Sequence, residues 1–306
     1  MAHRNAAESV IQQVMAELNF IEYNVNPDTH SYQECGTVIR QLGFKKLSIT
    51  KSKTASMWVA GKCIMLVNTR TDTDTGLSGV GFNSDNCLDG SVKCTTTGLN
   101  FCKFYGINVY SYPIDMFRKN YDEYFDSSMS EAPGTLPLDY VVGLTVNNSS
   151  VNVMNEFADK LNFKVIKKSE SFVTTSCVNN RLNLLWNNNT SETRFKKLII
   201  TTSDIFAVLA DYATMGFNLS ETSHSSNIDQ FYSNAVDSDI PLPSKQKLKA
   251  YGLNIHGKPK SYVIEKQIKH PLPNLDIIIS QRFNHNGVNE ESIVSYEIKN
   301  TEQHIS

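Results

Sequence analysis

The chain has 306 residues, which is enough for two ordinary domains, each with its own hydrophobic core. Hydrophobic residues make up 40% and charged residues 20%, a composition typical of globular proteins and not of disordered or fibrous ones. The formal net charge of −2, with lysine and arginine spread along the chain, excludes a basic surface for nucleic acid and a polybasic membrane patch.

No apolar run approaches the roughly 18–20 residues that a membrane helix needs. The first twenty residues contain Glu8 and Glu17 and no uninterrupted apolar stretch, so we expect a short amphipathic helix there and not a signal peptide. The six cysteines show neither C-x-x-C pairs nor zinc-finger spacing, which favours buried thiols. These features predict a cytoplasmic protein.

The first predicted unit is a strand, a helix and three short strands. The strand covers residues 18–25 (LNFIEYNV), and the helix covers residues 31–42. The segments KKLSIT, ASMWVA and GKCIMLVN follow as short strands. A looser second copy begins near residues 77–82 (LSGVGF) and ends near INVYSYP. Residues 127–137 are rich in Ser, Gly and Pro, which predicts a linker.

The third copy begins with a strand at residues 138–146 (LDYVVGLTV). A helix carrying Val153, Phe157 and Leu161 at helical spacing follows, and then the strands FKVIKK, SFVTTSC and RLNLLWN.

The fourth copy begins with the strand KKLIITT and a helix at residues 204–214, with Ser203 as the expected N-cap and Gly216 as the stop. Residues 221–247 read as an irregular stretch.

The repeated unit predicts an α+β fold in which tandem βαβββ modules form two open, cupped, mixed β-sheet domains. We expect an N-terminal domain at residues 1–130, a supporting pair of modules. We expect a C-terminal domain at residues 138–306, a pair of modules that carries the pocket.

Segments in both halves match one known family in order, from about residue 16 to residue 300. In the first half these are NFIEYNVNP and the stretch from VIRQLGFKK to MLVN. In the second half they are LDYVVGLTV, FADKLNFKVIKK, KKLIITTSDIFAVLADYATMGFNL and the stretch from KLKAYGLNIHGK to SQRFNHNG. The sequence resembles the 4-hydroxyphenylpyruvate dioxygenase family of the vicinal-oxygen-chelate superfamily. The resemblance implies the vicinal-oxygen-chelate fold and a homo-oligomer.

The resembled family holds a non-haem iron(II) with two histidines and one carboxylate, which leaves positions open for a 2-oxo acid and dioxygen. The resemblance places Tyr140 and Lys197 at the two histidine positions and Ile278 at the carboxylate position. An ammonium group repels a cation, and an isoleucine side chain has no ligand atom. Asp276, two residues before Ile278 and therefore on the same strand face, is the nearby carboxylate that can stand in. We expect no metal and no other cofactor.

Four further residues are implied as ligand contacts. Asn187 matches a family asparagine that faces the substrate, and Glu265 falls where the family carries a substrate-facing glutamine. Gln281 and Arg282 match the pair that ends the family's last core strand. These matches predict a small-molecule site in the second half.

Two interpretations of these residues stay open. In the functional one, Lys197 holds a carboxylate or enolate, Tyr140 donates a hydrogen bond or moves a proton, and Glu265 or Asp276 acts as a base. In the structural one, Lys197 pairs with Asp276, Tyr140 simply packs, and Arg282 makes an ion pair at the strand end.

Other polar residues are interpreted as structural. The seven histidines fall in terminal or loop-like segments without the spacing of a ligand pair, which predicts solvated or locally hydrogen-bonded side chains. In the first half, Glu22 occupies the position of an opening-strand ligand, whereas Gly79 and Gly81 offer no partner ligand.

Three functions follow from the sequence. The first is a dioxygenase-like protein that binds or transforms a small organic acid or natural-product-like ligand, such as an aromatic or 2-oxo acid, by metal-independent acid–base chemistry. The second is a non-haem iron dioxygenase of an aromatic 2-oxo acid with rearranged ligands. The third is a non-catalytic paralogue with a structural or regulatory role. We favour the first, because polar side chains remain at Lys197, Asn187 and Glu265.

Overall fold

The structure is a computed structural model of the chain. It describes most of the chain between residues 20 and 284. The described ranges are 20–61, 63–83, 90–112, 114–132, 134–147, 163–168, 172–177, 183–187, 194–219, 225–234, 242–258 and 261–284, with single positions at 152, 155, 156 and 159. The predicted N-terminal helix lies outside these residues, as do Val153, Phe157 and Leu161 of the helix predicted in the third copy.

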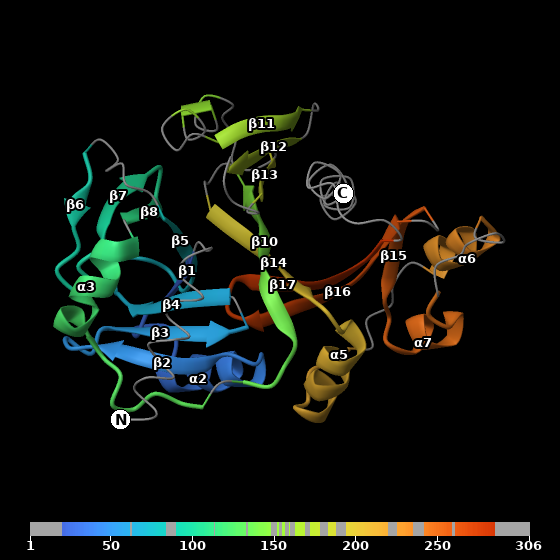
Figure 1. Ribbon diagram of the computed structural model, residues 1–306, viewed down its shortest axis with the longest axis horizontal. Helices are drawn as coiled ribbons and strands as arrows, with labels where there is room; N and C mark the ends of the chain where they lie inside the picture. Colours follow the sequence, from blue (N-terminus) through green and yellow to red (C-terminus); the bar gives the residue numbers. More distant parts are fainter. Residues whose placement is uncertain are drawn as a thin grey trace.

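The first half forms a nine-stranded mixed sheet in the order β6-β7-β8-β5-β1-β4-β3-β2-β9 (Figure 1). Its strands are β1 (Phe20–Val25), β2 (Lys45–Thr50), β3 (Ala55–Ala60), β4 (Cys63–Thr69), β5 (Gly76–Asn83), β6 (Val92–Lys93), β7 (Asn100–Phe104), β8 (Ile107–Tyr112) and β9 (Phe125–Asp126). The central strand β1 runs parallel to β4 and antiparallel to β5. Side chains of β1 therefore have neighbours on both flanking strands.

Among the described residues, helices α2 (Tyr32–Gln41) and α3 (Ile114–Tyr124) accompany this sheet. The helix predicted at residues 31–42 is confirmed as α2, and Ser31 is its N-cap, since the side chain accepts a hydrogen bond from Glu34 N. Helix α3 was not predicted. The first copy of the repeat is thus a complete βαβββ unit, from β1 to β4.

The second half forms an eight-stranded sheet in the order β11-β12-β13-β10-β14-β17-β16-β15. Its strands are β10 (Leu138–Asn147), β11 (Phe163–Lys168), β12 (Phe172–Cys177), β13 (Asn183–Asn187), β14 (Arg194–Thr202), β15 (Asn254–Lys258), β16 (Ser261–Leu272) and β17 (Leu275–Asn284). Helices α5 (Ile205–Thr214), α6 (Ser225–Ser233) and α7 (Lys245–Ala250) belong to this half. The mixed sheets with few helices confirm the α+β fold class. The division into two domains stays a prediction.

Two details of the second half correct the sequence predictions. The N-cap of α5 is Asp204 and not Ser203, because Asp204 has the extended backbone and its carboxylate accepts a hydrogen bond from Ala207 N at 3.0 Å. The helix ends at Gly216, which has a φ of +88°, as predicted. Residues 221–247 are not wholly irregular, since α6 and the start of α7 lie there.

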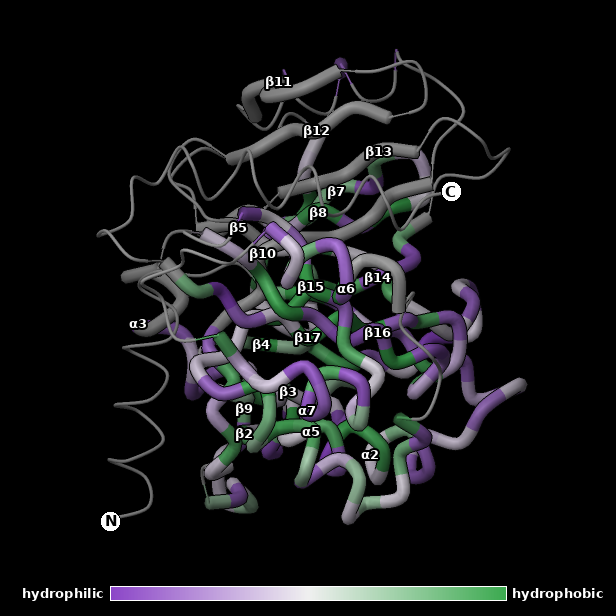
Figure 2. Tube along the Cα trace, turned by 90° about the vertical axis from the view of Figure 1, so that its right-hand side faces the viewer, coloured by the Kyte–Doolittle hydropathy of each residue, from purple (hydrophilic) through white to green (hydrophobic). Residues whose placement is uncertain are grey.

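One hydrophobic cluster joins the two halves. It includes Tyr23 and Met65 from the first sheet and Leu198, Ile277 and Ile279 from the second. The hydrophobic segments, drawn in green, gather in the middle of the molecule (Figure 2). The halves therefore bury apolar surface against each other.

Hydrogen bonds reinforce this contact between the halves. Tyr23 OH donates to Pro273 O at 2.9 Å, and Asn274 Nδ2 donates to Thr75 O at 2.8 Å, so the hairpin between β16 and β17 is held by the first half. On the other side of the contact, Tyr212 OH donates to Leu42 O at 2.9 Å.

Two further expectations concern buried thiols and membrane-spanning helices. Among the described residues, Cys35 and Cys63 are buried free thiols, whereas Cys94 and Cys102 are half-buried. No helix in the described part of the chain has the length and apolar character to cross a membrane.

Candidate functional site

One face of the second sheet carries an unusual number of buried polar groups. Lys197 on β14 is paired with Asp276 on β17, and Ser280 on β17 is paired with Glu265 on β16. Paired residues point to the same side of a sheet, and side chains alternate along each strand, so these four share one face. The opposite face carries Leu198, Ile200, Ile277 and Ile279, which pack into the shared hydrophobic cluster. We call the first of these the polar face and define it by Lys197, Asp276, Ser280, Glu265 and His256.

Lys197 lies on β14, one of the two middle strands of the sheet. The residue is 9% exposed. Burial lowers its pKa, because removal from water disfavours the ammonium form, while the carboxylates of Asp276 and Glu265 act in the opposite direction. The ammonium group therefore lies within electrostatic reach of acidic groups on two other strands. This geometry brings three of the predicted site residues together.

Asp276 is held in place by residues of the neighbouring strand β16. Its carboxylate accepts hydrogen bonds from His270 N at 2.9 Å and from Gln267 Nε2 at 3.1 Å. The largely exposed ring of His270 lies beside it, with Nδ1 at 3.2 Å from the carboxylate. Asp276 is 5% exposed, so it is a buried carboxylate with several donors at one end of the polar face.

Glu265 is bonded to a histidine that the sequence reading assigned to a loop. His256 lies on β15 and is buried, and its Nε2 is 2.8 Å from Glu265 Oε1. The prediction that His256 lies in a loop-like segment is wrong. The residue is paired with Val263 of β16, two positions from Glu265, which puts it on the polar face. Gly257 and two lysines nearby hide this short edge strand in the sequence.

Ile278 and Tyr140, two of the residues predicted to replace metal ligands, are located by their strands. Ile278 is buried on β17, two residues from Asp276 and therefore on the polar face. The backbone of Tyr140 belongs to β10, at a point where the pairing with β14 shifts register, and its side chain lies outside the described part. Across the described residues, no three His, Cys, Asp or Glu side chains form a group that could hold a metal ion.

The remaining predicted ligand contacts are spread over three positions. Asn187 ends β13 opposite Asn147 of β10, and its side chain lies outside the described part. Arg282 is half-buried and shares the alternation of Asp276, which puts it on the polar face. Gln281 lies on the opposite face.

The side chain of Gln281 binds the start of α5. Its Oε1 accepts a hydrogen bond from Ile205 N at 3.0 Å, and its Nε2 donates to Ser203 O at 2.5 Å. Both polar atoms of the amide thus hold the strand-to-helix turn. The structure places Gln281 away from the other predicted ligand contacts.

The first half contains a different polar centre at Glu22, which is fully buried in the middle of β1. Its carboxylate accepts hydrogen bonds from Asn68 on β4, from Ser78 Oγ on β5 at 2.9 Å, and from Asn108 Nδ2 and Tyr110 OH on β8 at 2.7 and 2.5 Å. Each carboxylate oxygen accepts two hydrogen bonds, which matches the capacity of a carboxylate. Glu22 thus ties together four neighbouring strands.

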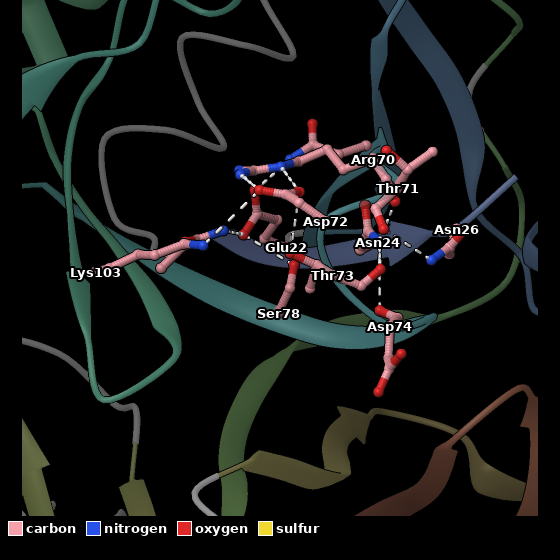
Figure 3. A network of polar contacts seen from close by, with 12 residues as sticks. Glu22, Asn24, Asn26, Arg70, Thr71, Asp72, Thr73, Asp74, Ser78 and Lys103 are labelled. Carbon is pink, nitrogen blue, oxygen red and sulfur yellow. Dashed lines mark hydrogen bonds and ion pairs between the residues drawn. The ribbon is translucent and has the colours of Figure 1, made fainter. Parts of the chain in front are cut away.

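Burial raises the pKa of Glu22, and the donors together with the nearby Arg70 partly offset this effect. Arg70 is itself paired with Asp72, with 2.7 Å between Nη2 and Oδ2 (Figure 3). Gly79 makes room for the carboxylate, because a Cβ there would lie 2.5 Å from Glu22 Oε2. The glycine that offers no ligand in the sequence therefore serves the packing of Glu22.

Comparison with known proteins shows the fold. No family model matches the chain, and no curated protein matches it in sequence. A solved fusion of a xylose isomerase-like TIM barrel with 4-hydroxyphenylpyruvate dioxygenase is similar, with a TM-score of 0.69, 12% identity and 94% of this chain covered. This chain spans 52% of the fusion protein's length. A mutant of 4-hydroxymandelate synthase from Streptomyces coelicolor has a TM-score of 0.63 and 13% identity, with 94% of this chain and 99% of the synthase covered. The chain therefore shares the fold of these two proteins, the vicinal-oxygen-chelate fold.

Proposed function

We propose that the protein binds a small organic acid over the polar face of its second sheet, with Lys197 as the group that holds the ligand's carboxylate. The main support for this proposal is that Lys197 is buried on a middle strand of the sheet. The sequence resemblance matches this lysine to an iron ligand of the resembled family. Burying an ammonium group is costly unless anionic groups compensate for it. A carboxylate ligand is one such group.

The donor set supports chemistry that does not depend on iron. The sequence resemblance matches the family's three iron(II) ligands to a phenol, an ammonium and an alkyl side chain, namely Tyr140, Lys197 and Ile278. A lysine ammonium has donors and no lone pair for a metal, and isoleucine has no donor atom at all. Ferrous iron in oxygenases prefers two imidazoles and one carboxylate on one face. These residues do not fit iron(II).

The carboxylates near Lys197 set the ligand's position. Asp276 is already bonded to His270 and Gln267, which fixes it at one end of the polar face. Glu265 is bonded to His256 on the other side. Asp276 and Glu265 keep hydrogen bonds to other donors when the Lys197 ammonium group turns away from them. The ammonium group can therefore reorient toward an incoming anion. The two similar solved structures are named for 4-hydroxyphenylpyruvate and 4-hydroxymandelate, which are aromatic organic acids, and this makes aromatic 2-oxo acids the first ligands to test.

Elemental analysis and a melting screen test this proposal. We expect purified protein to contain far less than one equivalent of iron, and phenylpyruvate or a related aromatic 2-oxo acid to raise the melting temperature. The variant Lys197→Met removes the charge at similar length, so the ligand-induced shift disappears. The matched control is Lys196→Met, because Lys196 is the exposed neighbour on the same strand and its loss leaves the shift intact.

Other outcomes would favour the alternatives. Stoichiometric iron that is lost on chelation together with ligand binding would identify an iron dioxygenase with rearranged ligands. Absence of any ligand-induced shift across the panel would favour a non-catalytic paralogue. Equal ligand shifts in wild type and Lys197→Met would remove Lys197 from the binding site.

A further inference from the structure

The turn between β16 and β17 is anchored to the first half of the chain. Pro273 and Asn274 form this turn. Tyr23 OH donates to Pro273 O at 2.9 Å, and Asn274 Nδ2 donates to Thr75 O at 2.8 Å. Tyr23 lies on β1, and Thr75 directly precedes β5. Both residues of the turn are therefore hydrogen-bonded to the first half, at two separate points.

The two anchoring groups are themselves held firmly. Tyr23 is fully buried in the hydrophobic cluster that joins the halves. Thr75 is also buried, and its Oγ1 accepts a hydrogen bond from Asn26 N at 2.9 Å. Asn274 has a φ of +56°, in the left-handed region that glycine and asparagine adopt more readily than other residues. The turn thus has a defined shape and a defined place on the first half.

This turn is two residues away from Asp276 on the polar face. On its other side, the pairing of β16 with β17 is interrupted between Ile268 and Leu272. Within this interruption His270 has a φ of +48°, and its backbone N–H donates to Asp276 Oδ1 at 2.9 Å. The position of the Asp276 carboxylate therefore depends on the shape of β16 next to the turn.

Asp276 and an acid bound at Lys197 compete for the same ammonium group. Lys197 is paired with Asp276 in the ladder between β14 and β17. Burial lowers the pKa of Lys197, and the Asp276 carboxylate is the main group that opposes this effect. His270 holds one carboxylate oxygen and Gln267 holds the other. Loss of the His270 donor would free Oδ1 to turn toward Lys197, and a closer ion pair would leave the ammonium group less available to a ligand.

We propose that Tyr23 and Asn274 are positioning residues for the acid-binding site. They fix the turn and with it the His270 N–H, which keeps Asp276 from closing onto Lys197. This inference rests on the proposed function, because Lys197 is the group that binds the acid. It gives the first half a role in ligand affinity, although neither positioning residue lies on the polar face.

Two substitutions remove the anchors with little other change. Tyr23→Phe removes only the hydroxyl. Asn274→Gly removes the amide of an exposed residue and keeps one that adopts a positive φ. We expect each variant to raise the Kd of phenylpyruvate by about fivefold or more in calorimetric titrations. The matched control is Tyr212→Phe, which removes another hydrogen bond between the halves, to Leu42 O, and leaves the Kd unchanged.

A second background shows whether the effect passes through Asp276. In Asp276→Asn no carboxylate competes for Lys197, so phenylpyruvate should bind at least as tightly as it does to wild type. Asn274→Gly added to this variant should change the Kd by less than about twofold. A purely structural loss would weaken binding by the same factor in both backgrounds.

A measurement without ligand separates this inference from the proposed function. The carboxylate carbon resonance of Asp276, assigned in NMR spectra by its absence from Asp276→Asn, reports the surroundings of that group. We expect it to move in Asn274→Gly and to stay in place in Tyr212→Phe.

The outcomes distinguish the two proposals. An unmoved resonance in Asn274→Gly overturns the positioning role, whether or not an acid binds. Equal effects of Asn274→Gly on the Kd in both backgrounds, or an equal effect of Tyr212→Phe, overturn it as well. If the resonance moves but no aromatic 2-oxo acid binds wild type, the proposed function fails and the link between the turn and Asp276 stands.

Discussion

The four hydrogen bonds on Glu22 predict a measurable coupling between this residue and Tyr110. The Tyr110 hydroxyl donates to the carboxylate at 2.5 Å, and the ring packs against Phe20 and Phe101 with centroid distances of 5.3 and 5.5 Å. Tyr110→Phe keeps the ring and removes only the donor. At alkaline pH, where Glu22 is ionised, a hydrogen bond to this charged group contributes about 1.5–3 kcal/mol, so the free energy of unfolding should fall by that amount.

Tyr110→Phe should lower the free energy of unfolding by a smaller amount when residue 22 is neutral. In a Glu22→Gln background the Tyr110 hydroxyl bonds to an uncharged amide, for which about 0.5–1.5 kcal/mol is typical. The difference between the two costs is a coupling energy of about 1–1.5 kcal/mol. Urea unfolding followed by circular dichroism measures all four corners of this double-mutant cycle.

A second buried tyrosine is the control for the cycle. Tyr121 OH donates to the neutral Ser48 Oγ at 2.5 Å, so Tyr121→Phe should destabilise the protein without coupling to Glu22→Gln. Additivity within about 0.5 kcal/mol is the expected result for that pair. If Tyr110→Phe and Glu22→Gln were also additive, the view of Glu22 as a carboxylate held by directed donors would be refuted.

Three further outcomes follow from the structure. Burial raises the folded-state pKa of Glu22 above its usual 4.5, so wild type should lose stability relative to Glu22→Gln as the pH rises above that value. Urea unfolding of both proteins from pH 4.5 to 8 measures this difference. A difference in the free energy of unfolding that stayed constant would contradict the prediction. Gly79→Ala should destabilise the protein by about 1–3 kcal/mol, because its Cβ would lie 2.5 Å from backbone and carboxylate atoms. Gly36→Ala in α2 has room for the Cβ and should be neutral or stabilising in melting experiments. Asp204→Ala should cost about 1 kcal/mol through loss of the cap of α5, and an equal cost for Ser203→Ala in urea unfolding would show that the cap is assigned to the wrong residue.

Much of the fold follows from local signals in the sequence. Strands such as β3 and β4 are short apolar runs between turns, and α2 has a serine cap followed by helical apolar spacing. These signals are local, so each strand or helix can be predicted from its own segment of the sequence. The strand that carries Lys197 was also predicted, because KKLIITT is a clear strand segment.

The partners in the candidate site depend on long-range contacts and were not predictable in the same way. His256 was missed because β15 is a short edge strand next to Gly257, which reads as a loop. Its bond to Glu265 depends on the ladder between β15 and β16. Similarly, Glu22 and Asn108 are 86 positions apart, and only the sheet order brings their side chains together.

The hydrophobic cluster shared by the halves limits how the chain can be divided. A fragment that stops after β9 would leave the buried ring of Tyr23 in water, and a fragment that starts at β10 would do the same to Ile277 and Ile279. Each fragment would then expose a large apolar surface to water. Complementary fragments produced together in one cell should associate through these surfaces, whereas either fragment alone should aggregate.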